Sequence, residues 1–539
     1  MTNPSLIRRN NHATGAGTAK AARPPGKRDR NRQSAESRLA ELRCRLLEIN
    51  DLGAAGALLA WDHATYMPAG GAPARARQGA TLRRLAHEKS VDPGLGRLID
   101  ELQPRADSLA HGAASLIRVA RRDFEKAVKV PSDYVARANA LGSASYDAWT
   151  RARPANDFPA MVPYLEEMLD LSREYAGFFA PYEHVADPLI DDADEGMTTA
   201  SVRRLFDALA RELVPIVRAI SEQPPADDRC LRGKFAEAAQ LDFSRAVVER
   251  MGYDFTRGRL DTTHHPFCTK FSAGDVRITT RVYAGDIGQA LFSTLHEAGH
   301  ALYEQGVGAA LEGTPLGSGV SAGVHESQSR LWENQIGRSA GFWRHFYPRL
   351  QRAFPDQFAG VTLDAFYRAI NKVEHSLIRT DADEVTYNLH IMLRFELELE
   401  LLESRLAVKH LPEAWREAMQ AHLGLVPPDD RDGCLQDVHW YAGGIGGAFH
   451  SYTLGNILSA QFHAAAVKAH PQIPQEIERG EFGMLRAWLT ERVYQHGRTY
   501  TPNELIERAT GEPMSMRPYI AYLRAKYGEL YRLPPAPRG

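Results

Sequence analysis

The chain of 539 residues contains only four cysteines, Cys44, Cys230, Cys268 and Cys434, and no two of them form a Cys-x-x-Cys pair. This scarcity excludes a disulfide framework and a thiol-rich zinc site, and it favours a reducing compartment. No stretch approaches the ~18 consecutive apolar residues that a membrane span requires, and the N-terminus lacks the apolar core of a secretory signal. We therefore expect a cytoplasmic protein with no membrane partner.

Net charge is also nearly absent, because 65 Lys and Arg residues face 67 Asp and Glu residues, which gives −2. The balance points to no polyanionic partner, so we do not expect a nucleic-acid partner. Residues 1–35 are the exception, with a net charge of +7 and no aromatic residue. Such a segment cannot bury enough apolar surface to offset the entropy of ordering. We predict that residues 1–36 form a disordered basic extension, a solvated tail rather than a nucleic-acid contact or an organellar presequence.

Beyond this tail, apolar residues recur at helical spacing, as in residues 39–49, 202–213 and 373–406. The spacing predicts a mainly α-helical body of about fifteen helices, with breaks at prolines and glycines and with no fixed repeat. One segment, Asp275–Tyr283, instead alternates with a period of two and is rich in β-branched residues. That alternation predicts a strand directly before the most informative motif.

The motif is His296-Glu297-x-x-His300, within a predicted helix over Asp286–Gly306. Residues four apart share a helix face, so both imidazoles can reach one metal ion. Glu297 is rotated by about 100° from His296, which can place its carboxylate beside an open metal position, where it would take a proton from bound water. The alternative is a helix that carries two surface histidines.

A catalytic zinc ion needs a third protein ligand and an open position for water. Position 303 is Tyr rather than Gly, which excludes the metzincin continuation of the motif. A glutamate from a later helix can serve instead, and Glu326, which follows His325, is the expected third ligand. On spacing alone, Glu333 and Glu304 remain its rivals.

Ligand histidines are usually oriented by a further carboxylate or carbonyl. Asp383 and Glu384, expected on a long helix through Val373, are candidates for this role beside Arg379. An exposed i,i+4 pair between Arg379 and Asp383 is an equally acceptable interpretation, worth only tenths of a kcal/mol.

Short motifs in a fixed order extend this pattern along the chain. They are Trp61-Asp-x-x-Thr-x-Met-Pro68, His265-Pro-Phe267, His296-Glu-x-x-His300, His325-Glu-Ser-Gln-Ser329, Ile378-Arg-x-x-Ala-Asp-Glu384, Gly433-x-x-Gln-Asp-x-His-Trp440 and Ala509-Thr-Gly511. Together they resemble the thermostable, Taq-type zinc carboxypeptidases over residues 37–530.

The resemblance implies one large helical metallopeptidase fold over residues 37–539, with a deep cleft and a small β-sheet next to the active-site helix. It implies a homodimer that removes single amino acids from peptides with a free C-terminus. One Zn²⁺ ion per chain is expected, although two imidazoles and a carboxylate also accept Co²⁺ or Mn²⁺.

Carried over by matching position, the metal ligands would be His296, His300 and Glu326, and the general base would be Glu297. Arg379 would meet the terminal carboxylate of the substrate, since a planar guanidinium can hold a carboxylate with two hydrogen bonds.

The sequence departs from the family in one segment, residues 439–452. There the family has Gly-Tyr-Phe-Pro-x-Tyr after its His-Trp pair, whereas this chain has Ala448 for the first tyrosine and His450 for the proline. Tyr452 is retained, and Tyr441 or His450 are possible substitutes for the missing tyrosine. The departure puts catalytic efficiency or substrate choice in question, but not the metal site.

We expect His439, and then Tyr452, to donate to the developing oxyanion, which one such donor stabilises by about 3 kcal/mol. The alternative for His439 is a structural role beside Trp440. The extended substrate is expected to pair with the strand over residues 275–283. Two other functions remain open at this point, an oligopeptidase or endopeptidase on the same scaffold and a catalytically impaired, metal-containing peptide-binding protein.

Overall fold

The computed structural model describes residues 27–109 and 112–534, and within residues 27–34 it describes the backbone alone. Helix α1 spans Lys27–Thr65, so residues 27–36 are helical and the predicted boundary of a disordered extension at residue 36 is wrong. Residues 1–26, which make up the rest of that predicted extension, lie outside the described residues.

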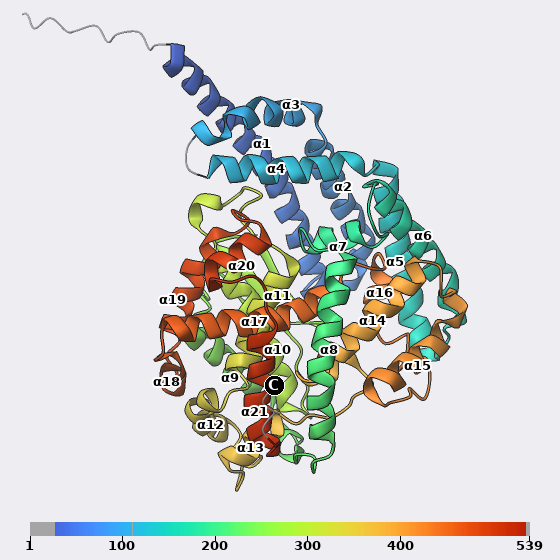
Figure 1. Cartoon of the computed structure of the whole chain (residues 1–539), viewed down its shortest axis with the longest axis vertical. Coiled ribbons are helices and arrows are strands. Elements are labelled where there is room, and N and C mark those ends of the chain that lie inside the picture. The colour runs from blue at the N-terminus through green and yellow to red at the C-terminus, as the bar shows by residue number, and fades with distance from the viewer. Residues whose placement is uncertain (1–26, 110–111, 535–539) are drawn as a thin grey trace, which may run out of the picture.

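The first four helices form a layer at one end of the molecule (Figure 1). They are α1, α2 (Ala72–Ser90), α3 (Pro93–Leu102) and α4 (Ala113–Lys129). Leu42, Leu98 and Ile117 are buried in a core of their own, which Leu316 of a later loop completes.

Two larger cores lie beneath this layer. The first is built by α5 (Ser132–Ala155), α6 (Val162–Gly177), α7 (Asp187–Ala193), α8 (Thr199–Ser221), α14 (Tyr387–Leu402), α15 (Leu411–Leu423), α16 (His439–Ala442) and α21 (Arg517–Tyr531). The second is built by α9 (Glu237–Met251), α10 (Ile287–Gly306), α11 (Ala322–Arg330), α12 (Ala340–Ala353), α13 (Leu363–Ile370), α18 (Ile473–Glu478), α19 (Gly483–Arg492) and α20 (Pro502–Thr510).

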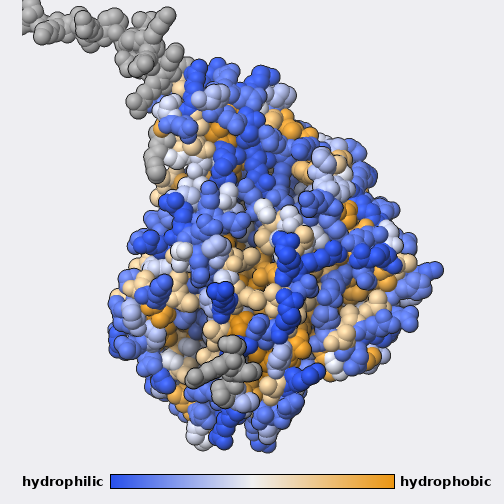
Figure 2. Space-filling model, viewed as in Figure 1, coloured by the Kyte–Doolittle hydropathy of each residue, from blue (hydrophilic) through white to orange (hydrophobic). Residues whose placement is uncertain are grey.

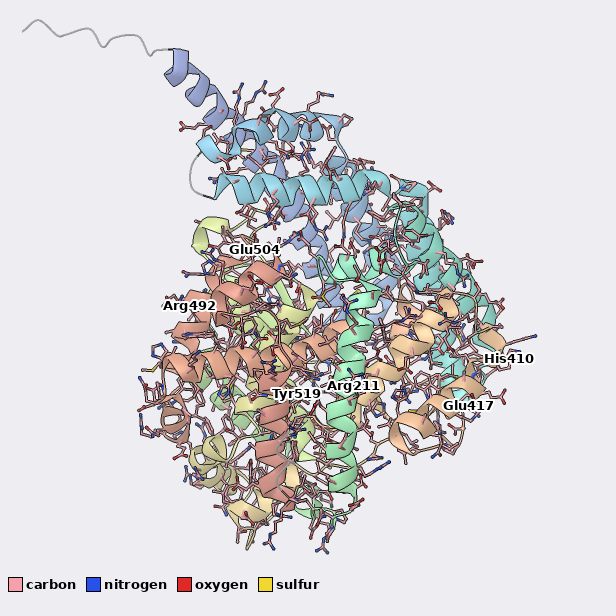
Figure 3. All side chains as sticks on the ribbon, viewed as in Figure 1. Arg211, His410, Glu417, Arg492, Glu504 and Tyr519 are labelled. Carbon is pink, nitrogen blue, oxygen red and sulfur yellow. The ribbon has the colours of Figure 1, made fainter. Side chains whose placement is uncertain are left out.

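Helix α17 (Phe449–Ala469) joins the two large cores. Its Ile457 packs in the first core, whereas its Phe462 packs in the second. Figure 1 shows it crossing the middle of the molecule, with α21 in front of it. The side chain of Tyr519 on α21, labelled in Figure 3, accepts a hydrogen bond from Asn388 Nδ2 at 2.8 Å and donates to the carbonyl of Glu384 at 3.0 Å. Sequence-distant segments are thus fixed around the centre of the molecule.

A three-stranded sheet packs against α10. Its strands are β1 (Leu260–Thr262), β2 (Cys268–Ser272) and β3 (Asp275–Thr280), in the order β1-β3-β2. Strand β3 runs parallel to β1 and antiparallel to β2. The predicted strand is therefore present but ends at Thr280. Because β3 is paired on both sides, the prediction that a substrate would add to it is wrong.

The mainly helical prediction is confirmed, although the described residues form 21 α-helices rather than about fifteen. The predicted long helix over residues 373–406 is wrong in its first half. Only Tyr387–Leu402 forms α14, and residues 371–386 are irregular apart from a short 3₁₀ turn at Arg379–Asp381.

Hydrophilic residues cover most of the face shown in Figure 2, with apolar residues scattered between them. Among the described residues, no helix combines the length and the apolar character that crossing a bilayer requires.

Candidate metal centre

Helix α10 carries the His-Glu-x-x-His motif near the middle of the molecule. Its first turn is capped by Asp286, whose carboxylate accepts from the amide of Gly288 at 2.7 Å. The helix matches its predicted span within one residue, and its position between the sheet and α11 leaves most of its side chains buried.

Two glycines allow neighbouring helices to approach the motif closely. A Cβ atom at Gly299 would lie 2.5 Å from the carbonyl of Gln328 on α11. A Cβ atom at Gly455 on α17 would lie 2.4 Å from Cγ of Glu326. Both distances are far below van der Waals contact, so any larger residue would displace the backbone that carries Glu326.

The structure brings together the three residues that the sequence analysis selected as metal ligands. Oε2 of Glu326 lies 3.6 Å from Nε2 of His296 and 3.4 Å from Nε2 of His300. One ligand atom from each residue lies within 4.8 Å of the other two. Two imidazoles and one carboxylate facing a common point are a donor set that suits a catalytic zinc ion.

The ligands are held by a further carboxylate and an arginine. Nδ1 of His296 is 2.9 Å from Oε2 of Glu333, which leaves Nε2 to face Glu326. Arg330 donates from Nε to Oε1 of Glu326 at 2.7 Å and from Nη1 to Glu333 at 3.3 Å. Glu333 therefore pairs with the opposite ring nitrogen of His296 from the one that faces Glu326, which leaves Glu326 as the candidate third ligand.

Both carboxylates are ionised in this setting. Burial raises the pKa of Glu326, but Arg330 and His296 outweigh burial and hold the pKa well below its usual range. Burial also raises the pKa of Glu333, but Arg330 and His296 outweigh burial and lower the pKa to about 2. The centre thus offers negative charge to a cation.

The pKa values of Glu297 and His300 are shifted toward the neutral form of each side chain. Burial raises the pKa of Glu297 to about 7, although the nearby His296 opposes the shift. Burial also lowers the pKa of His300 to about 4, and the neighbouring His325 adds to this effect. A neutral imidazole is the form that binds a metal.

The other rival ligand, Glu304, lies one turn beyond His300 and faces away from the centre. Its carboxylate lies 2.9 Å from Nε2 of His325 and accepts from Nζ of Lys270 at 3.0 Å. The ring of His325 stacks on that of His300, with centroids 4.6 Å apart and an interplanar angle of 21°.

Asp383 and Glu384 do not orient the ligand histidines, so that prediction is wrong. Asp383 instead accepts from the amides of Val385 and Thr386 at 2.9 and 3.1 Å, in the turn just before α14 begins. Glu384 accepts from Tyr527 Oη at 2.6 Å and also pairs with a lysine of α21. The residues lie outside any long helix, and a local surface pair with Arg379 does not form either.

Arg379 is instead buried and paired with a residue far along the chain. Its Nε and Nη2 donate to the two oxygens of Asp437 at 2.5 and 3.1 Å. Nη1 donates to the hydroxyl of Tyr387 at 2.9 Å. Asp437 thus occupies the Nε and Nη2 edge of the guanidinium, which can donate two parallel hydrogen bonds to one carboxylate. Asp437 also accepts from Nε of Arg394 at 2.8 Å.

Asp437 connects this arginine to the predicted oxyanion donors. Its Oδ1 lies 2.6 Å from Nδ1 of His439, whose Nε2 lies 3.0 Å from the hydroxyl of Tyr452. A carboxylate at Nδ1 favours the tautomer with the proton on that nitrogen, so Nε2 accepts from Tyr452. Asp437 belongs to one of the sequence motifs, but the motif alone indicates no role for it, because its partners Arg379 and Arg394 lie 58 and 43 residues away.

The proposed substitutes for the missing tyrosine do not reach this site, which corrects that expectation. Tyr441 is fully buried and donates to the carbonyl of Cys434 at 2.8 Å. His450 is also fully buried, with Nε2 at 3.2 Å from the carboxylate of Asp194. Tyr387 on α14 supplies a hydroxyl here instead, which sequence spacing gave no means to find.

All predicted site residues line one large cavity of about 1190 Å³. They are His296, Glu297, His300, Glu326, Arg379, His439 and Tyr452. The cavity corresponds to the expected cleft, and it places the carboxylate of Glu297, the three candidate metal ligands and the buried guanidinium of Arg379 around the same space.

Comparison with known proteins identifies the family of the chain. The chain matches the carboxypeptidase Taq (M32) metallopeptidase family over residues 41–527. It is 42% identical over 492 residues to thermostable carboxypeptidase 1 of Thermus thermophilus, covering 89% of this chain and 96% of the relative. It is 38% identical over 489 residues to carboxypeptidase 1 of Bacillus subtilis, covering 90% and 97%.

Solved structures give the same result. The crystal structure of the M32 carboxypeptidase from Deinococcus radiodurans superposes with a TM-score of 0.90 and 52% identity, covering 92% of this chain and all of that one. The Pyrococcus furiosus carboxypeptidase superposes with a TM-score of 0.88 and 34% identity, covering 91% and 99%. The chain therefore belongs to the carboxypeptidase Taq (M32) family and is a metal-dependent carboxypeptidase.

Proposed function

We propose that the enzyme releases C-terminal amino acids from peptides at one zinc ion bound by His296, His300 and Glu326. The observation that carries the proposal is the convergence of these three ligand atoms within 4.8 Å. The donor set fits the ion, because both imidazoles present Nε2 and the carboxylate between them is ionised. Cobalt or manganese would satisfy the same ligands. Zinc held by these three side chains would supply Lewis-acid chemistry, polarising the scissile carbonyl and lowering the pKa of a water molecule to about 7.

Glu297 is the proposed general base. Glu297 lines the cavity together with both histidines, and the residue is only 7% exposed. Among the described residues no hydrogen bond engages this carboxylate, which leaves it free to take a proton from the attacking water. It would then deliver that proton to the leaving amine nitrogen.

Arg379 is the proposed contact for the terminal carboxylate of the substrate. Since Asp437 occupies Nε and Nη2, the contact would use Nη1, beside the hydroxyl of Tyr387. The role of Asp437 is to fix the guanidinium in the cavity wall. His439 and Tyr452 line the same cavity, and we place them at the oxyanion.

The substrate backbone would add to β2, whose outer edge is the free edge of the sheet nearest the metal ligands. Cys268 at the start of β2 lines the same cavity as Glu297. An antiparallel peptide runs opposite to β2, so its C-terminus would lie at the Cys268 end, in the cavity that holds Arg379. This polarity suits a carboxypeptidase.

The test of this mechanism is Glu297→Gln. We expect the variant to bind one metal ion per chain as the wild type does and to lose most of its turnover. Turnover close to that of the wild type would remove Glu297 as the base. In parallel, a peptide with a free C-terminus should be shortened, whereas its C-terminal amide should not. Cleavage of both peptides at equal rates would favour an endopeptidase.

The proposal includes a homodimer in the cytoplasm. The dimer rests on the family resemblance, and light scattering should give twice the chain mass of 59.9 kDa. The cytoplasmic location is supported by the four cysteines, all of which are free thiols.

A further inference from the structure

A second cavity, of about 500 Å³, lies between the N-terminal helices and the sheet. Its walls come from α1, α4 and β2, together with the loop over residues 312–318. Apolar side chains dominate the lining, among them Leu46, Ile49, Phe124 and Phe271. The α1 wall also contains Gly53 and other small residues, which leave the space open.

Strand β2 connects this cavity to the metal centre. Cys268, at its first position, lines the metal cavity, whereas Lys270 and Ser272 line the second cavity. At about 3.3 Å per residue, the two cavities are separated by roughly 7–13 Å along the strand. Helix α10 also connects the two cavities, because His300 lines the metal cavity and Glu304, one turn later, lines the second cavity.

The outer edge of β2 presents unpaired backbone groups along this path. The amide of Thr279 on β3 donates to the carbonyl of Phe267 at 2.9 Å. Phe267 and every second residue after it therefore point their backbone N–H and C=O groups toward β3. In an antiparallel pair the residues between them point their backbone groups outward. Those residues are Cys268 and Lys270, and β2 is an edge strand of the described sheet.

The charged side chains around the second cavity are already paired. Nζ of Lys270 donates to Glu304 at 3.0 Å and to a backbone carbonyl. Arg498 binds both oxygens of Asp123 at 2.9 Å, and Glu312 accepts from the amide of Ala273. A charged ligand group would have to displace one of these partners. An apolar group needs no such displacement and would bury its surface against the lining.

We propose that the second cavity is a substrate subsite, which receives an apolar side chain about two to four residues upstream of the scissile bond. A peptide lying antiparallel to β2, with its C-terminus in the metal cavity, passes this opening with its upstream residues. The inference rests on the proposed function, because it uses the same peptide path. It predicts that kcat/KM depends on substrate residues upstream of the two that flank the cleaved bond.

Two glycines of α1 provide a matched pair of variants. Gly53 lines the second cavity, and a Cβ atom there meets nothing within 4 Å, so Gly53→Phe can fill the space without a backbone clash. Gly56 lies three residues later on the same helix, also with nothing within 4 Å of a Cβ atom, but it lines neither cavity. Gly56→Phe therefore adds the same side chain and the same helix propensity elsewhere.

The experiment measures kcat/KM, by mass spectrometry, for N-acetylated hexapeptides with identical C-terminal dipeptides. Leu or Asp replaces one upstream residue at a time, and the N-acetylated dipeptide alone serves as the short reference substrate. We expect Leu to exceed Asp by about tenfold at one or two upstream positions. Gly53→Phe should abolish this preference and leave the dipeptide rate unchanged, whereas Gly56→Phe should keep the preference.

Equal rates for Leu and Asp at every upstream position would overturn the subsite, and so would a preference that survives in Gly53→Phe. Both outcomes leave the proposed function intact, because the dipeptide is still cleaved. Failure to release the terminal residue even from the dipeptide would instead overturn the proposed function, and the subsite with it.

Discussion

Replacing Glu333 by Gln isolates the support that the protein gives to a metal ligand. Glu333 lies 2.9 Å from Nδ1 of His296, and the two side chains are only 12% and 18% exposed. The hydrogen bond is therefore poorly screened by solvent. Bonds of this kind to a charged group contribute about 1.5–3 kcal/mol. Glutamine keeps the shape and a neutral acceptor, so part of the bond remains.

We expect Glu333→Gln to weaken zinc binding by about 10–100-fold, equivalent to about 1.4–2.7 kcal/mol. The direct ligands stay in place, so kcat at saturating zinc should change little. The assay is competition with a chelator of known affinity, with activity measured over the same zinc range.

Glu374→Gln is the matched control, since Glu374 lines the same cavity but pairs with Lys372 at 2.6 Å. It removes the same charge without touching a ligand, and its zinc affinity should stay near that of the wild type. An unchanged affinity in Glu333→Gln, or an equal loss in both variants, would refute the reasoning.

Two further predictions concern buried charges. Burial raises the pKa of Glu398 from 4.5 to about 7. Between these two pH values the folded state keeps a proton that the unfolded state has released, so the free energy of unfolding falls as the pH rises from 4.5 to 7. Urea unfolding of Glu398→Gln should match the wild type near pH 4.5 and exceed it by about 3 kcal/mol at pH 8, whereas a difference independent of pH would contradict this. Asp437→Asn leaves Arg379 and Arg394 without their shared carboxylate, so unfolding should show a loss of about 3–5 kcal/mol, and wild-type stability would contradict that pairing.

The parts of the site that the sequence predicted depend on local spacing. The two histidines of α10 are four residues apart, and helix geometry alone places them on one face. The choice between Glu326 and Glu333 was harder, because seven residues bring both to the same side of a helix. The structure distinguishes them by the imidazole nitrogen that each carboxylate faces.

The features of the structure that the sequence did not predict depend on contacts between segments far apart in the chain. The apolar spacing of residues 373–386 resembles that of a helix, but two carboxylates hold this segment in an irregular path. Asp383 accepts from the amide of Val385 before α14 begins, and Asp437 binds Arg379. Periodicity contains no information about a partner 58 residues away. Strands β1 and β2 are short and gain their hydrogen bonds from β3, so their own residues give a weak signal.

The most direct test of the central claim is a calorimetric titration of the metal-free protein with zinc. We expect one ion per chain for the wild type. We also expect Glu326→Gln to weaken binding by more than the 10–100-fold expected for Glu333→Gln, because Glu326 is the proposed direct ligand. Equally tight binding by Glu326→Gln, or a wild type that takes up no zinc, would contradict it.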